Sequence, residues 1–322
     1  MNTRKQKNRE DTLRLRAARN VWPRALLFMV LSACSAVAGA QSMALTFDDG
    51  LNPDAQPKAQ RWNREMLTAL KDMKVTAMIF PAVSSLGGNA GIGLVREWAE
   101  AGHTVGNHTT THRSLASSKV TLEEFIEDVE EADAVLRRIP KFVPMLRFPY
   151  LKEGDTAEKR DGIRRWMKQH DYRPAPVSID ASDWYYNQVF VKFIDAGQAD
   201  RAERVKDAYV AHLLDRAQYY DALSRQVLAR SPKHVLLLHT NAINAASIHE
   251  VITAFRGRGW KLISPRAAFD DTLYAMKPDV LPAGESIIWA LAKERGVPDL
   301  RYPAEDSVYE EPKLKQLGLL PD

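Results

Sequence analysis

The feature that most constrains the fold is an alternation of apolar, β-prone runs with amphipathic stretches, from Met43 to about Tyr274. Seven runs are expected to be strands: 44–47, 75–80, 104–107, 145–148, 176–180, 235–239 and 261–264. The stretches that have apolar residues at helical spacing are 56–72, 93–101, 121–138, 157–170, 200–230 and 245–256. Thr121 and Glu124 have the spacing of a capping box, which marks one helix start. Short strands separated by helices favour an α/β fold with a mostly parallel sheet, and most simply a barrel.

Two regions are expected to be additions to this barrel. The connection over residues 187–234 is long and has apolar residues at helical intervals, which predicts a helical insertion. After Tyr274 the chain becomes rich in proline and acidic residues, apart from a short apolar helix expected over residues 286–295. We therefore expect residues 43–275 to form the barrel and residues 276–322 to form a C-terminal extension packed on it.

Residues 1–40 have the pattern of an export signal. A basic region precedes the apolar stretch "ALLFMVLSACSAVA" (25–38), and the small residues "AGA" precede Gln41. The only cysteine, Cys34, lies in "LSAC" (31–34), which resembles the lipobox of bacterial lipoproteins. Two outcomes stay open: lipid attachment at Cys34, or cleavage after Ala40. We therefore expect an exported protein, either periplasmic or anchored to a membrane through Cys34, and otherwise secreted.

The same leader accounts for the basic character of the chain. Residues 1–24 hold eight Lys or Arg and two acidic residues, so six of the excess positive charges lie there. The chain has a formal net charge of +4, which leaves −2 for the remainder. This distribution removes the main support for a nucleic-acid partner. The 322 residues, of which 45% are hydrophobic, suffice for a large core.

Polar residues lie at the ends of five predicted strands. They are Asp48 and Asp49, His108 and His112, Arg147 and Tyr150, Asp180 and Asp183, and His239. In a parallel α/β barrel the carboxyl ends of the strands open on one face, so these side chains are expected to meet at one mouth. On a helical turn, His108 and His112 would share one face, and two imidazoles with one carboxylate form a familiar zinc shell. For Asp180, a role beside the ligand and a role as a strand-end cap stay open.

The five motifs together resemble those of the polysaccharide deacetylases, carbohydrate esterase family four, which include chitooligosaccharide and peptidoglycan deacetylases. In order, they are "TFDDG" (46–50), "HTTTH" (108–112), "RFPY" (147–150), "DASDW" (180–184) and "LLLH" (236–239). The resemblance implies a distorted (β/α) barrel with seven or eight parallel strands. It also implies a metal-dependent hydrolase that removes N-acetyl groups from a glycan of the cell envelope or extracellular space. The long insertion departs from the common pattern and puts in doubt the transfer of any one relative's substrate.

The resemblance also implies a role for each motif. Asp49, His108 and His112 would hold one divalent metal ion, Zn²⁺ or a similar ion such as Co²⁺. Asp48 would act as the general base, with Arg147 beside it to keep the carboxylate ionised.

The remaining motifs would serve the transition state and the leaving group. The backbone N–H of Tyr150 would stabilise the oxyanion. His239 would be the general acid that protonates the leaving amine, with Asp183 orienting it. An apolar wall for the acetyl methyl group would be formed by Trp184, Tyr185 and Leu236.

Other functions on the same scaffold stay open at this point. One alternative is an O-acetyl esterase of the xylan type, or a deformylase. Another is a carbohydrate-binding lipoprotein without catalysis. The intact base, metal ligands and acid favour an enzyme, since a binding protein has no need for all of them. The two adjacent carboxylates need a particular backbone, because in an extended strand Asp48 and Asp49 would point to opposite faces. If the strand ends there and Gly50 takes an unusual backbone conformation, both carboxylates can reach the same mouth.

Overall fold

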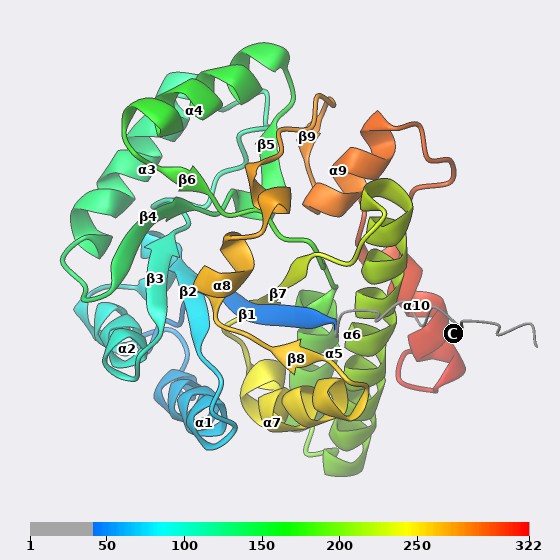
Figure 1. The fold of residues 1–322 in the computed structure, drawn as a ribbon. Coiled ribbons are helices and arrows are strands. Elements are labelled where there is room, and N and C mark those ends of the chain that lie inside the picture. Colours follow the sequence, from blue (N-terminus) through cyan, green and yellow to red (C-terminus); the bar gives the residue numbers. More distant parts are fainter. Residues whose placement is uncertain (1–40, 322) are drawn as a thin grey trace, which may run out of the picture. The chain divides into compact units, whose positions relative to one another are not determined.

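A curled sheet of parallel strands organises residues 41–321, which are the part of the chain that the computed structural model describes (Figure 1). The strand order is β6-β4-β3-β2-β1-β7, and β8 pairs with the beginning of β1. The strands are β1 (Ser42–Asp49), β2 (Ala77–Pro81), β3 (Thr104–Asn107), β4 (Phe142–Leu146), β6 (Arg173–Pro174), β7 (Lys233–His239) and β8 (Lys261–Leu262). All their pairings are parallel, as the alternation of strands and helices predicts.

Helices surround the outer face of the sheet, where Figure 1 shows α1, α2, α3, α4 and α7. The helices that follow the strands are α1 (Ala59–Asp72), α2 (Asn89–Glu100), α3 (Leu122–Leu136), α4 (Ala157–Gln169), α7 (Ala242–Gly257) and α8 (Pro265–Phe269). The predicted capping box is confirmed at α3: Glu124 N–H donates to Thr121 Oγ1 (3.1 Å), and Thr121 N–H donates to Glu124 Oε2 (2.8 Å). Three short 3₁₀ turns complete this part: η1 (Val83–Leu86), η2 (Pro149–Leu151) and η3 (Thr272–Ala275).

The sheet is closed by an irregular segment, so the prediction of a strand over residues 176–180 was wrong. Within this range the only strand-like contact is a single parallel bridge between Ile179 and Leu236 of β7. Pro174 and Pro176 lack the N–H groups that a regular ladder needs. The chain nevertheless passes from β6, beside β4, to the open edge of β7, which gives a distorted barrel.

The long connection before β7 is helical. It contains α5 (Asp183–Asp195) and the 30-residue α6 (Ala199–Leu228), which packs against α5 and α7. The sequence interpretation placed the beginning of the insertion at residue 187, whereas helix α5 begins at Asp183. This earlier start matters because it places a predicted catalytic residue on the first turn of α5.

The chain after Tyr274 contacts both the barrel and the long helix. Strand β9 (Ala283–Gly284) pairs antiparallel with β5 (Lys152–Gly154), and α9 (Ile287–Glu294) packs against α6. Helix α10 (Ser307–Gln316) follows. Gly39–Asp322 forms one compact unit, and the boundary drawn at residues 275 and 276 stays a prediction.

Two further predictions concern segment bounds and the leader. The predicted strand 145–148 is displaced, since β4 spans Phe142–Leu146. The expected export signal over residues 1–40, with Cys34, lies outside the described residues. Among the helices of residues 41–321, none combines the length and apolar character that crossing a membrane requires.

Candidate active site

The two adjacent carboxylates lie at the carboxyl end of β1. Asp48 pairs in register with Phe80 on one side and with His239 on the other. The backbone reverses at Asp49 (φ 79°) and Gly50 (φ 99°), so the positive φ begins one residue earlier than the sequence suggested. The φ of Gly50 is one that other residues rarely adopt, and a Cβ there would also lie 2.4 Å from Leu86 Cδ2, so the position favours glycine. The reversal brings both carboxylates to the same cleft.

Asp48 forms a buried ion pair with Arg147, which follows β4. Arg147 Nη1 lies 3.1 Å from both carboxylate oxygens of Asp48, and the two residues are 0% and 2% exposed. Arg147 also donates to Ala175 O (2.6 Å) and to Thr46 Oγ1 (3.1 Å), and its guanidinium lies over the Phe80 ring. Burial raises the pKa of Asp48 to about 6, although the positive charge of Arg147 opposes this rise.

Asp49, His108 and His112 bring three potential metal ligands together. Asp49 Oδ1 lies 3.7 Å from His108 Nε2 and 3.5 Å from His112 Nε2, and the two imidazole Nε2 atoms are 3.1 Å apart. The group is one of two clusters of potential metal ligands among residues 41–321. Within the described chain, Asp49 Oδ1 is buried without a hydrogen-bond partner, as expected of an oxygen that awaits a cation.

The two histidines reach this position from an irregular loop, not from the helical turn that the sequence suggested. Thr109 (φ 67°) and His112 (φ 56°) have left-handed backbone conformations, which fold the loop after β3 back on itself. His108 Nδ1 donates to Arg147 O (2.8 Å), which leaves Nε2 with its lone pair free for a ligand. Burial, followed by the neighbouring His112, lowers the pKa of His108 to about 3, so this imidazole is neutral as metal binding requires.

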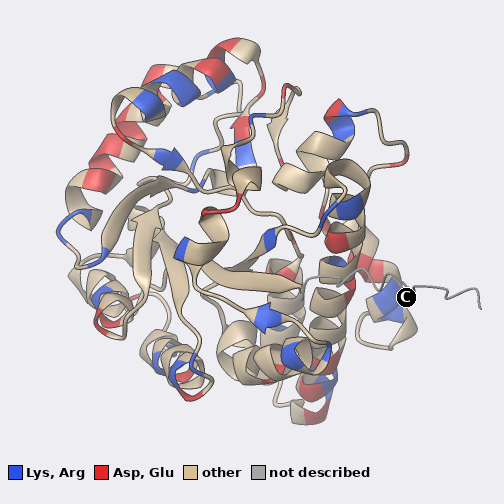
Figure 2. Ribbon diagram, in the orientation of Figure 1, with Lys and Arg blue, Asp and Glu red and all other residues tan. Residues whose placement is uncertain are grey.

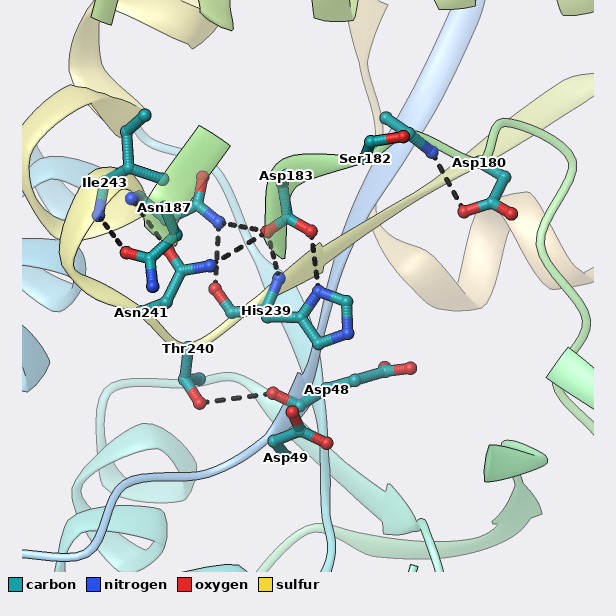
Figure 3. A network of polar contacts seen from close by, with 12 residues as sticks. Asp48, Asp49, Asp180, Ser182, Asp183, Asn187, His239, Thr240, Asn241 and Ile243 are labelled. Carbon is teal, nitrogen blue, oxygen red and sulfur yellow. Dashed lines mark hydrogen bonds and ion pairs between the residues drawn. The ribbon is translucent and has the colours of Figure 1, made fainter. Parts of the chain in front are cut away.

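His239 and Asp183 form the second charged pair of the site (Figure 3). Asp183 Oδ1 accepts from His239 Nδ1 (2.6 Å), while Oδ2 accepts from the backbone N–H of His239 (2.8 Å). Oδ2 also accepts from Asn241 Nδ2 (3.1 Å) and Asn244 Nδ2 (2.8 Å). Burial acts to lower the pKa of His239, but Asp183 outweighs it and the pKa rises to about 10.

Asp48 and His239 have opposite protonation states over the same pH range. Since the pKa of Asp48 is about 6 and that of His239 is about 10, near pH 8 the first is ionised and the second carries a proton. The register of β1 and β7 places these residues side by side on one face of the sheet. The arrangement therefore offers a general base and a general acid in one cleft.

The cleft has a volume of about 820 Å³ and is lined by most of the predicted residues. Tyr150, with φ 56°, lies at its edge, and its ring centroid is 4.7 Å from that of His112. Trp184 also lines the cleft from the first turn of α5. Asp180 lines it too, and its Oδ1 accepts from Ala181 N–H (2.9 Å), so both interpretations of Asp180 have a structural basis.

Two predicted wall residues do not line the cleft. Leu236 is 0% exposed in the core, and its neighbour Leu237 lines the cleft instead, because alternate residues of a strand face opposite sides. Tyr185 does not line the cleft either. Asn187 and Gln188 line it together with Trp184, because residues three and four positions apart share one face of a helix. Both assignments to the apolar wall were therefore wrong.

The sequence interpretation also missed several residues of the site. Thr240 Oγ1 accepts from Gly50 N–H (2.8 Å) and donates to Asp48 O (3.1 Å), so it ties β7 to the reversal after β1. Asn241 and Asn244 hold Asp183, and Asn241 also caps α7. Their positions directly after "LLLH" are the only signal that could have indicated them.

Comparison with known proteins shows which family part of this chain is similar to. The family model described as polysaccharide deacetylase matches residues 36–174. Over these residues the chain is similar to the polysaccharide deacetylases. The matched range includes Asp48, Asp49 and both histidines of the cleft, but it ends before Asp183 and His239. The structure nevertheless places His239, with Asp183, beside the matched residue Asp48.

Curated proteins that are similar to this chain have related names. A peptidoglycan-N-acetylglucosamine deacetylase of Bacillus cereus is 32% identical over 44% of this chain and 46% of its own length. A chitooligosaccharide deacetylase of Rhizobium leguminosarum is 32% identical over 45% of this chain and 60% of its own length. A Listeria monocytogenes peptidoglycan deacetylase is 30% identical over 50% of this chain and 31% of its own length. The chain thus spans between 31% and 60% of the length of these relatives.

Solved structures show that the chain has the expected fold. The polysaccharide deacetylase Bc1974 from Bacillus cereus superposes with a TM-score of 0.50 at 21% identity, over 70% of this chain and 91% of the other. A mutant of BA3943, a family-four pseudoenzyme from Bacillus anthracis, gives a TM-score of 0.51 at 16% identity, over 72% and 69%. A pseudoenzyme shares this fold, so the fold alone does not establish activity.

Proposed function

We propose that this protein is a metal-dependent hydrolase that removes N-acetyl groups from an N-acetylamino-sugar glycan. The observation that carries the proposal is the pairing of Asp48 with Arg147 and of His239 with Asp183 around one cleft. A binding protein has no use for a base and an acid held in opposite protonation states. Hydrolysis of an amide requires both, because the amine is a poor leaving group until it is protonated.

The residues that would hold the metal are Asp49, His108 and His112. The partnerless Asp49 Oδ1 and the free Nε2 of His108 fit a divalent cation, and this donor set suits Zn²⁺. When bound, such an ion polarises the acetyl carbonyl and lowers the pKa of water.

The chain's own groups would perform the proton transfers. Asp48 takes the proton of the attacking water, and Arg147 stabilises the carboxylate form that this requires. The water oxygen bonds to the acetyl carbon, and the Tyr150 backbone N–H stabilises the oxygen that becomes negative. His239 gives its proton to the nitrogen as the C–N bond breaks, which yields acetate and a free amine. Trp184 forms the apolar wall beside the acetyl methyl group.

The substrate and location are part of the same proposal. The names of the relatives support a glycan that contains N-acetylglucosamine. The export-signal pattern of residues 1–40 supports a place in the cell envelope or outside the cell, with or without a lipid on Cys34.

Acetate release by the purified protein tests the proposal. The substrates are chitooligosaccharides, peptidoglycan, a β-1,6-linked N-acetylglucosamine polymer and acetylated xylan, each with added zinc or with a chelator. We expect release from at least one N-acetylated glycan, its loss on chelation and its return with zinc. Release from xylan alone would favour the O-acetyl esterase, and release that survives chelation would contradict the metal-dependent mechanism.

A further inference from the structure

The catalytic cleft extends to a wall that the C-terminal extension supplies. Residues Glu285, Pro303, Glu305 and Asp306 line the same cavity as Asp48 and His239, opposite part of the barrel mouth. Lys152 of β5 also lines this side and forms an ion pair with Glu285. The proposed hydrolysis uses none of the residues of this wall, so their charges serve no step of that reaction.

Among the residues of this wall, Glu305 gives the strongest indication that a ligand binds here. Its side chain is 2% exposed, and its Oε1 accepts from Tyr220 Oη (3.1 Å) and from Arg216 Nη1 (3.4 Å). Its Oε2 is buried and has no hydrogen-bond partner within residues 41–321. Burial, followed by the negative charge of Asp180, raises the pKa of Glu305 to about 8. A cation bound at Oε2 would supply the missing partner and favour the carboxylate form.

The charged groups around Glu305 leave an excess of negative charge. Asp180 and Asp306 line the cleft with it, and Asp306 uses Oδ1 to accept from Val308 N–H (3.2 Å) at the start of α10. Lys152 is paired with Glu285, and Arg216 is shared between Glu305 and Asp215. The carboxylates that line this part of the cleft therefore outnumber the positive charges beside them.

A second metal ion does not suit this position. His212, Glu305 and Glu310 have their ligand atoms within 4.8 Å of one another, which makes them the other metal-like cluster of the described chain. His212 Nε2, however, accepts from Ser182 N–H (3.2 Å), so Nδ1 carries the proton and donates to Glu310 Oε2 (3.0 Å). This imidazole has no lone pair left for a metal. The free oxygen of Glu305 is better matched by a hydrogen-bond donor that carries a positive charge.

We propose that Glu305, together with Asp180 and Asp306, forms a subsite for the ammonium group of an amino sugar that has already lost its acetyl group. The proposal rests on the proposed deacetylase function, since the ammonium group is that reaction's own product on a neighbouring sugar. An ammonium group offers N–H donors and one positive charge, which a neutral N-acetyl group does not. A partly deacetylated glycan is therefore the preferred substrate. Each turnover produces an ammonium group that favours binding of the next acetylated sugar along the glycan.

Binding and turnover of matched oligosaccharides test this subsite. One tetramer of N-acetylglucosamine is fully acetylated, and the other carries a single free amine next to an acetylated sugar. We expect the zinc-loaded protein to have a KM about tenfold lower for the second tetramer, which corresponds to about 1.4 kcal/mol. Glu305→Gln keeps an acceptor for Tyr220 but removes the charge, so the ratio of the two KM values should fall to near one. Asp299→Asn, which removes an exposed charge of the same extension away from the cleft, should keep the ratio.

A binding measurement separates this proposal from the deacetylase function. Calorimetry with zinc-free Asp48→Asn, in which turnover is expected to be negligible during the titration, compares the affinities for the two tetramers. A preference for the amine in binding, without acetate release by the parent protein, would support the subsite and contradict the proposed function. Acetate release with equal KM values would support the function and overturn the subsite.

Two further measurements distinguish the subsite from a folding defect and from a second metal ion. If Glu305→Gln does not fold, Asp180→Asn in the same binding assay decides, and an unchanged preference for the amine overturns the proposal. Zinc content is measured for the parent protein and Glu305→Gln. A second bound zinc ion that disappears in the variant would show a metal site at Glu305 and would also overturn the proposal.

Discussion

Replacing Asp183 with Asn should move the pH range in which the protein is active. In the parent protein, Asp183 is fully buried and its carboxylate accepts four hydrogen bonds, two of them from His239. The amide of Asn has no negative charge and only one acceptor oxygen. The imidazolium form of His239 should therefore be less stable in the variant, so the pKa of His239 should be lower.

The size of the effect follows from the pKa of His239. Its rise from 6.5 to about 10, against burial that acts to lower it, represents about 5 kcal/mol in favour of the protonated form. Asp183 is the largest contributor to this rise, with Asp49 and Asp48 contributing less. We expect at least about 2 pH units of the rise to disappear in the variant. Since His239 must carry a proton to act as the acid, the alkaline limb of the profile should move to lower pH by that amount.

The assay is kcat/KM for acetate release between pH 5 and 11, at saturating zinc, for the parent protein and Asp183→Asn. At pH 9 we expect a rate loss on an amide substrate of at least about tenfold, and a smaller loss on 4-nitrophenyl acetate, whose leaving group needs no proton. Circular dichroism and the melting temperature report whether the variant is folded. A folded variant with an unshifted alkaline limb would refute the assignment of His239 and Asp183 as the acid pair.

Four other substitutions test separate parts of the structure. Asp49→Asn should lose bound zinc, whereas Asp48→Asn should keep its zinc and lose a factor of about 10²–10⁴ in kcat. Metal analysis measures the zinc content of both variants, and equal zinc loss would contradict the assignment of separate roles to the two carboxylates. Arg147→Lys should lower the unfolding free energy by about 3 kcal/mol, because it breaks buried hydrogen bonds to Thr46 and Ala175. The same variant should move the acidic limb of the pH–rate profile to higher pH, because it raises the pKa of Asp48. Burial alone would raise the pKa of Asp271, but Arg230 and two backbone N–H groups lower it to about 2. Asp271 therefore stabilises the fold above pH 4 and loses this effect as pH falls through 2. Asp271→Asn should cost about 1–2 kcal/mol at pH 7 and nothing below pH 2, measured by urea unfolding.

The sequence predicted the chemistry-bearing ends of the strands because their positions depend on local pattern and on one topological rule. Parallel strands bring their carboxyl ends to one edge, so Asp48, His108, Arg147 and His239 could be expected to meet before any register was known. The strands that support Asp48, His108 and His239 lie where the apolar runs predict them. The functional roles of these residues stay predictions that the assays above address.

Features that depend on register and backbone conformation could not be predicted in the same way. Leu236 and Leu237 are equally apolar, and only the pairing of β7 with β1 decides which one faces the cleft. Similarly, the spacing of His108 and His112 suits a helical turn, but the loop reaches the same proximity with left-handed residues. Spacing alone therefore indicated the pair correctly and its local structure incorrectly.

The contribution of the C-terminal extension to the cleft has no local sequence signal, because it depends on how residues 300–306 fold back across the chain. Glu305 lies 125 positions after Asp180 in the sequence, yet both line one cavity. Acidic residues also lie elsewhere along the ribbon, so charge alone does not single out Glu305 (Figure 2). What distinguishes it is burial with an unpartnered oxygen. If the amine preference disappears in Glu305→Gln while acetate release persists, the strand ends perform the chemistry and the extension selects the substrate.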